Sequence, residues 1–183
     1  MEVPVTYDAV QIIVPRLWEE YKPQLVVHVG VSHLAEELTI EKLAHNCGYK
    51  SLDVNGKTAP SQCYSKTGAE CLHTTLDVDK LCKDINDSSC LAMALPSTDA
   101  GRYLCEYIYY ASLSHSTSSV MFIHVPKLNK PYTVAELADA LRCAVLAALK
   151  QLNLLHSLPL PGKHVLEEIQ RQNNQITKTR ELL

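Results

Sequence analysis

The sequence predicts an α/β fold with a largely parallel sheet that is covered by helices on both faces. Segments with apolar residues at helical spacing alternate along the chain with short segments that are almost continuously apolar. Strands buried on both faces have this continuous apolar character, and helices on each side of a sheet bury them. Apolar residues make up 46% and charged residues 20% of the 183 residues, which fits one globular domain and excludes a disordered chain.

Charge and hydropathy exclude several classes of function. The formal net charge is −3 and no basic stripe appears, which disfavours a nucleic-acid or membrane surface. No apolar run reaches the roughly 18 residues that span a bilayer. Residues 1–10 lack the basic and apolar regions of a secretory signal. We therefore expect a cytoplasmic protein with no nucleic-acid or membrane partner.

The chain contains seven cysteines, an odd number, and no two of them form a Cys-x-x-Cys pair. This usage predicts free thiols in a reducing cytosol, most of them serving as small core residues. No His/Cys/Asp spacing typical of zinc is present, and neither is a GxGxxG motif or a P-loop. The sequence therefore predicts no metal and no cofactor.

The first predicted helix covers residues 5–21, where one helical face carries the apolar residues Val10, Ile13, Val14, Leu17 and Tyr21. Pro15 predicts a kink or a new helix start within it, and Pro23 ends it. Residues 25–30 form a nearly continuous apolar run closed by a glycine, which predicts a buried strand.

The next stretch is less regular. Residues 38–45 fit either a strand or a short helix. Residues 46–72 are long and without periodicity, which predicts a functional or mobile loop. Residues 77–86 carry apolar residues at helical spacing and predict a short amphipathic helix.

Residues 91–96 and 120–125 are predicted strands, residues 100–111 a helix, and residues 112–119 a serine-rich loop. Two strands joined by a helix in this way predict a right-handed βαβ unit with parallel strands.

A T-x-x-E capping box at Thr133 and Glu136 predicts the start of the last long helix. Its predicted buried face consists of Leu137, Leu141, Val145, Ala148 and Leu152. The predicted domain ends at residue 155, and residues 156–183 are predicted to be a linker followed by a polar, helical tail.

Cys105 and His124 are the candidate reactive pair. The predicted βαβ unit puts Cys105 near the first turn of its helix and His124 near the carboxyl end of the next strand, at the sheet edge where sites are built. A helix N-terminus favours a thiolate, and an imidazole can hold it and protonate a leaving amine. Asp99 is the predicted N-cap, and backbone N–H groups there are placed for an oxyanion hole. The spacing also fits a core cysteine and a satisfied core histidine.

Four segments, in family order, resemble the pyroglutamyl-peptidase I family. STDAGRYLCEYIYY (residues 97–110) resembles the nucleophile segment and FIHVP (residues 122–126) the histidine segment. TIEKLAHN (residues 39–46) resembles the segment with the catalytic glutamate, and PQLVVHVGVS (residues 23–32) resembles a segment that lines the substrate pocket.

This resemblance implies a cytosolic cysteine peptidase with a three-layer α/β/α sandwich, which uses no metal and removes N-terminal pyroglutamyl residues from peptides. Carried over by position, Cys105 is the nucleophile, His124 the general base and acid, and Glu41 the residue that orients the imidazole. Val31 matches a position that lines the substrate pocket. His33 stands where the family has a glycine, and it is expected to narrow the pocket mouth or shift its backbone.

The resemblance also implies one larger difference. The family begins with a strand and a Phe-containing loop that forms one wall of the pocket, and this chain starts after that unit. We therefore expect a domain that is N-terminally truncated relative to the family, with one strand left unpaired. The three candidate residues favour a cysteine-type omega peptidase. The missing wall favours the alternative, a catalytically degenerate homologue that binds peptides or proteins.

Overall fold

The computed structural model describes residues 1–88 and 90–155. Met1–Leu152 form one compact unit, and a second unit covers Asn153–Leu183. The predicted linker and tail at 156–183 lie outside the described residues, so the predicted domain boundary remains a prediction.

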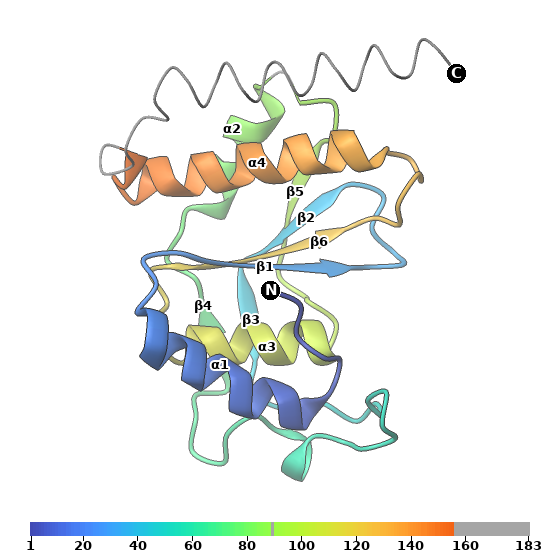
Figure 1. Cartoon of the computed structure of the whole chain (residues 1–183), viewed down its shortest axis with the longest axis vertical. Coiled ribbons are helices and arrows are strands. Elements are labelled where there is room, and N and C mark those ends of the chain that lie inside the picture. The colour runs from blue at the N-terminus through green and yellow to red at the C-terminus, as the bar shows by residue number, and fades with distance from the viewer. Residues whose placement is uncertain (89, 156–183) are drawn as a thin grey trace. The chain divides into compact units, whose positions relative to one another are not determined.

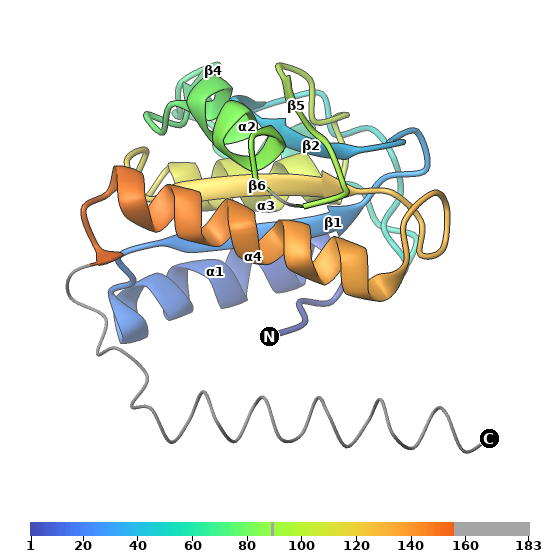
Figure 2. The same cartoon turned by 90° about the horizontal axis from the view of Figure 1, so that it is seen from above.

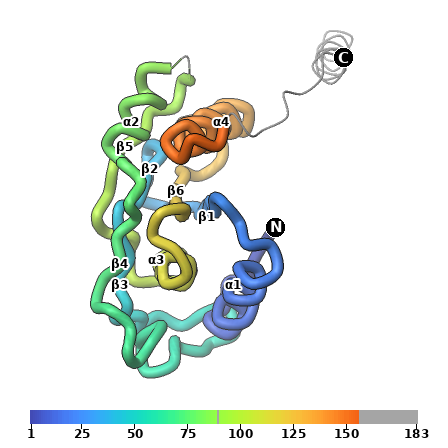
Figure 3. The backbone as a smooth tube through the Cα atoms, turned by 90° about the vertical axis from the view of Figure 1, so that its left-hand side faces the viewer, coloured from blue at the N-terminus to red at the C-terminus, as the bar shows by residue number. Residues whose placement is uncertain are grey.

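The described residues form three layers, with a four-stranded sheet in the middle (Figures 1 and 3). The sheet order is β1 (Val26–Val31), β6 (Val120–Val125), β2 (Leu38–Glu41) and β5 (Ala94–Ser97). One face is covered by α2 (Val78–Asn86) and α4 (Val134–Gln151), and the other by α1 (Tyr7–Tyr21) and α3 (Leu104–Leu113). The pairs β1–β6 and β2–β5 are parallel, which confirms the predicted α/β fold with a mainly parallel sheet.

The predicted βαβ unit is wrong, because its two strands are not neighbours. β2 lies between β5 and β6 and runs antiparallel to β6, so β5 and β6 point in opposite directions (Figure 2). The hydrophobic pattern of a strand records its burial but not its partner, which is why the inserted strand was not predicted. Residues 98–103 instead lead from the end of β5 to α3, which packs against β6 and β1.

The helix predicted at residues 100–111 is α3, and it begins four residues later than predicted. Gly101 has a φ of 95° and Arg102 a φ of 52°. Both values lie in the left-handed region, which a right-handed helix cannot include. Tyr103 is therefore the N-cap, and Leu104 is the first helical residue.

The helices α1 and α4 start at side-chain caps. Thr6 Oγ1 accepts a hydrogen bond from Ala9 N at 3.2 Å, and α1 continues through Pro15 as a single helix without a new start. The predicted capping box of α4 is confirmed: Thr133 Oγ1 accepts from Glu136 N at 3.3 Å, and Thr133 N donates to Glu136 Oε2 at 2.7 Å. Because these bonds lie within one helical turn, the local sequence was enough to predict them.

The inner face of α4 differs partly from the predicted one. Leu137 and Ala148 are buried as predicted, whereas Leu141, Val145 and Leu152 are half-buried. Two further alanines, Ala140 and Ala144, complete the buried stripe. These alanines belong to the part of the core that also contains the buried residues of α2, the helix beside which α4 lies.

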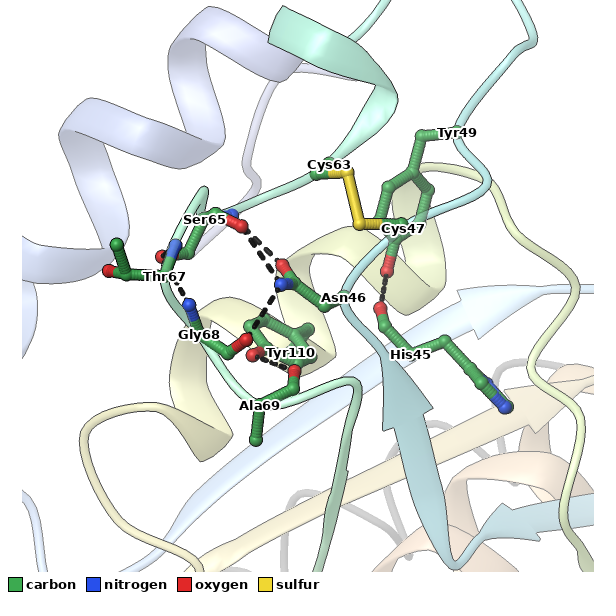
Figure 4. The surroundings of a disulfide bond; sticks show 10 residues. All are labelled: His45, Asn46, Cys47, Tyr49, Cys63, Ser65, Thr67, Gly68, Ala69 and Tyr110. Atoms are coloured by element: carbon green, nitrogen blue, oxygen red, sulfur yellow. Dashed lines mark hydrogen bonds between the residues drawn. A yellow bond between two sulfur atoms is a disulfide. The ribbon is translucent and has the colours of Figure 1, made fainter.

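The predicted loop at residues 46–72 is organised by tertiary contacts. It lies between two short strands, β3 (Leu43–His45) and β4 (Cys71–His73), which pair antiparallel as a second sheet; β4 itself starts within the last residues of the predicted loop. The Asn46 side chain accepts from Ser65 N at 2.9 Å and donates to Ser65 O at 2.8 Å and to Gly68 O (Figure 4).

The prediction that all cysteines are free thiols is wrong for four of them. Disulfides join Cys47 to Cys63 (Figure 4) and Cys90 to Cys143. Among the described residues Cys71, Cys82 and Cys105 are free. Cys47 and Cys63 face each other across an isolated antiparallel bridge, a contact set by tertiary pairing rather than by spacing along the chain.

Strand β6 is buried along its whole length and separates two parts of the core. Met121, Ile123 and Val125 pack on the side of α2 and α4, whereas Phe122 packs on the side of α3. Side chains alternate between the faces of a strand, so His124 shares the face of Phe122.

Candidate active site

His124 lies near the carboxyl end of β6 and faces α3. Its strand neighbours are Gly30 on β1 and Thr39 on β2. The imidazole is in an almost closed environment, with 8% of the residue exposed, and its ring lies 4.8 Å from that of Phe122. The inner strand β6 thus carries one polar, ionisable ring next to the apolar core on the side of α3.

Cys105 is the second residue of α3, and its sulfur lies against the main chain of β1. A Cβ atom on Gly30 would stand 2.8 Å from Cys105 Sγ and 3.0 Å from Phe122 Cζ. Only a glycine therefore leaves room for the sulfur at this level of the sheet. Sequence reasoning missed this role for Gly30; the signal was the glycine that closes an otherwise β-branched run.

Glu41 ends β2 and reaches the imidazole from the other side. Its Oε1 atom lies 2.8 Å from His124 Nδ1, and only 1% of the residue is exposed. The other carboxylate oxygen, Oε2, is buried and has no hydrogen-bond partner among the described residues. Tyr109 of α3 donates from its hydroxyl to the main-chain carbonyl of Glu41 at 2.9 Å, which ties β2 to the helix that carries Cys105.

The two neighbours of His124 determine its charge. Burial lowers the pKa of the imidazole, but hydrogen bonding to Cys105 and to Glu41, together with their negative charges, outweighs burial and raises that pKa to about 9. The ring is therefore an imidazolium at neutral pH, held between a sulfur and a carboxylate. Such an arrangement is suited to a thiolate–imidazolium pair, in which the ring stabilises the nucleophile and carries a proton for a leaving group.

The start of α3 adds free backbone donors beside the sulfur. Within the described part of the chain no side chain caps Tyr103, so the first N–H groups of α3 have neither a helical partner nor a cap. The predicted N-cap at Asp99 is wrong because the helix begins later. Asp99 Oδ1 instead accepts from Gly101 N at 3.1 Å and from Arg102 Nη1 at 2.9 Å.

Comparison with known proteins identifies the family of this chain. The sequence profile of a family described as pyroglutamyl peptidase matches residues 1–147. The chain belongs to the pyroglutamyl peptidase family. Human pyroglutamyl-peptidase 1 is 46% identical over 145 residues, which cover 79% of this chain and 69% of that protein. Human pyroglutamyl-peptidase 1-like protein is 31% identical over 151 residues, which cover 82% of this chain and 76% of that protein.

Solved structures show the same fold. A mutant pyrrolidone carboxyl peptidase from Pyrococcus furiosus superposes with a TM-score of 0.74 at 24% identity, covering 81% of this chain and 80% of that chain. The pyrrolidone carboxyl peptidase from Thermococcus litoralis gives a TM-score of 0.73 at 24% identity, covering 82% and 77%. The α/β/α sandwich implied by the family resemblance is thus confirmed.

The structure brings Cys105, His124 and Glu41 together, but not the side chains of the two pocket positions suggested by the family. Val31, which is 56% exposed, pairs with Val125 at the end of β1, and its side chain lies on the face opposite Gly30.

His33, the other pocket position, also lies outside the group formed by Cys105, His124 and Glu41. It lines a hollow of about 620 Å³ together with Ala35, Glu36 and residues of the segment after β6, Lys127 and 129–131. The described residues that line this hollow do not include Cys105, His124 or Glu41. The predicted roles of Val31 and His33 in substrate binding therefore remain predictions.

The described residues form neither a metal site nor a membrane-spanning helix. No group of three or more His, Cys, Asp or Glu side chains there is arranged to hold a metal ion. None of the helices in residues 1–88 and 90–155 combines the length and apolarity needed to cross a bilayer.

Proposed function

We propose that this chain is a cysteine-type omega peptidase that removes N-terminal pyroglutamyl residues from peptides. One observation carries the proposal: the buried His124 ring lies between the Cys105 sulfur and the Glu41 carboxylate in a member of the pyroglutamyl peptidase family. The name of its relative, pyroglutamyl-peptidase 1, supplies the substrate class.

In the first step the Cys105 thiolate attacks the carbonyl carbon of the pyroglutamyl residue. The S–C bond forms and the carbonyl electron pair moves to oxygen, where the uncapped N–H groups at the start of α3 stabilise the negative charge. As the tetrahedral intermediate collapses, the C–N bond breaks and His124 gives its proton to the departing amine. The products of this step are the shortened peptide and a pyroglutamyl thioester on Cys105.

In the second step water hydrolyses the thioester. His124, now neutral, takes a proton from the attacking water, the C–S bond breaks, and the Cys105 thiolate and the imidazolium are restored. Glu41 accepts the Nδ1–H of His124 in both steps, which orients the ring and stabilises its charged form. The three side chains and water supply every proton and electron pair, so the proposed reaction needs no metal ion and no cofactor.

We propose a cytoplasmic location, and no nucleic-acid or membrane partner. The need for a reduced Cys105 supports the cytoplasmic location. The net charge of −3 supports the absence of a nucleic-acid or membrane partner. The Cys47–Cys63 disulfide is the observation that favours an oxidising compartment instead, so the state of these two cysteines in the cell tests the location. In cells alkylated before lysis, mass spectrometry should find both residues as thiols in the cytosol, and as a disulfide in an oxidising compartment.

The alternative of a binding module without turnover is not favoured, because the chain keeps a complete Cys–His–Glu arrangement at 46% identity to pyroglutamyl-peptidase 1. The deciding experiment compares the purified chain with the Cys105→Ala variant on a fluorogenic pyroglutamyl amide and on the matching prolyl amide, which lacks the lactam carbonyl. We expect hydrolysis of the pyroglutamyl amide by the parent chain alone. Peptide binding without hydrolysis would support the binding module instead.

A further inference from the structure

The residue after Cys105, Glu106, is a buried carboxylate that the reaction above does not use. It is 0% exposed, although it lies in the first turn of α3. Buried carboxylates persist only where hydrogen bonds and opposite charges compensate for lost hydration. Its partners therefore show what it holds in place.

Glu106 reaches back to the segment that precedes the nucleophile. Its Oε2 atom accepts the main-chain N–H of Arg102 at 2.7 Å, and both carboxylate oxygens lie 2.9 Å from Arg102 Nη1. Arg102 has a φ of 52° and follows Gly101, whose φ is 95°. A left-handed arginine is held against its own conformational preference, so the bond to Glu106 stabilises the turn that leads into α3.

Glu106 also reaches across to the strand segment that continues from Glu41. Its Oε1 atom accepts the main-chain N–H of His45 at 3.0 Å and lies 2.9 Å from His45 Nδ1. His45 belongs to β3, four residues after Glu41 along the chain. One carboxylate thus links the turn before the nucleophile to the segment that bears the acid partner of His124.

We infer that Glu106 is a positioning residue for the peptidase reaction: it sets the turn at residues 101–103 so that the first N–H groups of α3 face the oxygen of the attacked carbonyl. This inference rests on the proposed function. It assigns Glu106 an effect on the tetrahedral intermediate and little effect on the formation of the Cys105 thiolate.

The charges of Glu106 and Arg102 explain why Glu106 should affect the tetrahedral intermediate and not the Cys105 thiolate. A lone carboxylate beside Cys105 would oppose a thiolate, but Arg102 pairs with Glu106 and balances its charge. In the Glu106→Gln variant the negative charge is gone while the Arg102 cation remains, so the thiolate is not disfavoured. Glutamine has one acceptor oxygen where Glu106 uses two, so it can accept from Arg102 N or from His45 N but not from both, and the link between the turn and β3 is broken.

The test measures turnover and thiol alkylation on the same protein. In Glu106→Gln we expect kcat on the pyroglutamyl amide to fall at least about tenfold, the scale of a disturbed oxyanion site, while KM changes less than about twofold. Alkylation of Cys105 by iodoacetamide at neutral pH should stay within about twofold of the parent rate, because that reaction forms no oxyanion.

Glu136→Gln is the matched control, because Glu136 is also the third residue of its helix and also accepts a main-chain N–H from the preceding segment. It should lower thermal stability slightly and leave kcat unchanged. Glu106→Asp is the second variant, since it keeps the buried charge paired for folding but is one methylene too short to reach Arg102 N and His45 N together. We expect the same selective loss of kcat in it.

A pyroglutamyl aldehyde separates the possible failures. The Cys105 sulfur adds to the aldehyde carbon and the proton carried by His124 ends on the oxygen, giving a hemithioacetal whose oxygen occupies the oxyanion site. Protection of Cys105 from iodoacetamide then reports its affinity, which should weaken at least about tenfold in both Glu106 variants. Folded Glu106 variants with parental kcat and aldehyde affinity would overturn the inference. A parent chain that neither hydrolyses the amide nor binds the aldehyde would overturn the proposed function itself.

Discussion

Two helices of this protein begin with the same local pattern and differ in what that beginning leaves free. In α4, Thr133 caps the helix and Glu136 completes the capping box at the surface. In α3, Tyr103 provides no side-chain cap within the described residues, and the glutamate at the equivalent position, Glu106, is buried and bonded to Arg102 and His45.

This difference shows how a helix start can be stabilised while its main-chain N–H groups remain free of partners. The α4 cap satisfies orphan N–H groups with its own side chains, as an exposed helix requires. At α3 the stabilising carboxylate points back to the preceding turn, so the N–H groups next to Cys105 stay available to a substrate. The start of α4 is therefore stabilised by covering its N–H groups, whereas the start of α3 is stabilised while its N–H groups stay free.

The largest expected effect concerns the thiol itself, because α4 offers a position equivalent to that of Cys105. Ala135 is the second residue of α4 and is exposed. We expect Cys105→Ala to lower turnover by about 10⁴-fold or more, and a second substitution, Ala135→Cys, to restore none of it. At pH 6 the Ala135→Cys thiol should react with iodoacetate at least about tenfold more slowly than Cys105, since no imidazolium faces it.

Peptide mapping of the alkylated protein checks this prediction, with Cys71→Ser as the control for a half-buried free thiol outside the site. Equal rates at the two helix starts would mean that the helix alone activates the thiol and that His124 does not.

The next effect concerns the acid behind His124. In Glu41→Gln we expect kcat to fall roughly 10³- to 10⁴-fold, as when the acid of a catalytic triad is neutralised. Glu41 helps to raise the pKa of His124 from its ordinary value of 6.5 to about 9, so kcat/KM of the parent chain should decline as pH rises through about 9. In the variant this decline should move to lower pH.

The same shift affects stability. Because the pKa of His124 is raised on folding, its contribution to the free energy of unfolding is complete below pH 6.5 and is lost as pH rises through about 9. Chemical denaturation of the parent chain and of Glu41→Gln across this pH range measures the loss of unfolding free energy. Glu20→Gln, a change at an exposed glutamate, is the control. A pH–rate profile of Glu41→Gln that overlays the parent profile would contradict the assignment.

A smaller effect concerns the space opposite the α3 start. The methyl group of Gly30→Ala would stand 2.8 Å from Cys105 Sγ, so the sulfur or the strand must move. We expect kcat to fall about 100-fold, the scale of a misplaced reacting group. Gly68→Ala is the matched control, because its methyl group would stand 2.5 Å from the Tyr110 hydroxyl oxygen and 3.0 Å from Ser65 Cβ, and it should lower the melting temperature without changing kcat. Parental kcat in Gly30→Ala would show that the sulfur is not confined there.

The smallest effect belongs to the α4 cap. Thr133→Ala removes the acceptor for Glu136 N and should cost about 1 kcal/mol of unfolding free energy, measured by urea denaturation. Turnover should not change, because α4 lies on the face of the sheet opposite α3 (Figure 1). A loss of kcat would show that the two helix starts are coupled through the sheet.

Local sequence by itself determined much of this protein. It determined the capping box at Thr133 and Glu136, the bounds of β6 at residues 120–125, and the helical face of α2, because each depends on contacts within one turn or one strand. The segments around Glu41, Cys105 and His124 also indicated the family. What these patterns predicted, the structure and the comparisons confirm for the fold class and the family.

Tertiary structure alone decided the rest. It inserted β2 between β5 and β6, which reversed the relative direction of the two strands predicted to be parallel. It also joined Cys47 to Cys63, delayed the start of α3 by a left-handed turn, and set Gly30 beneath the Cys105 sulfur. The physical reason is that strand partners and buried hydrogen bonds are chosen by competition among distant segments, and a pattern that records only burial does not state which segment wins.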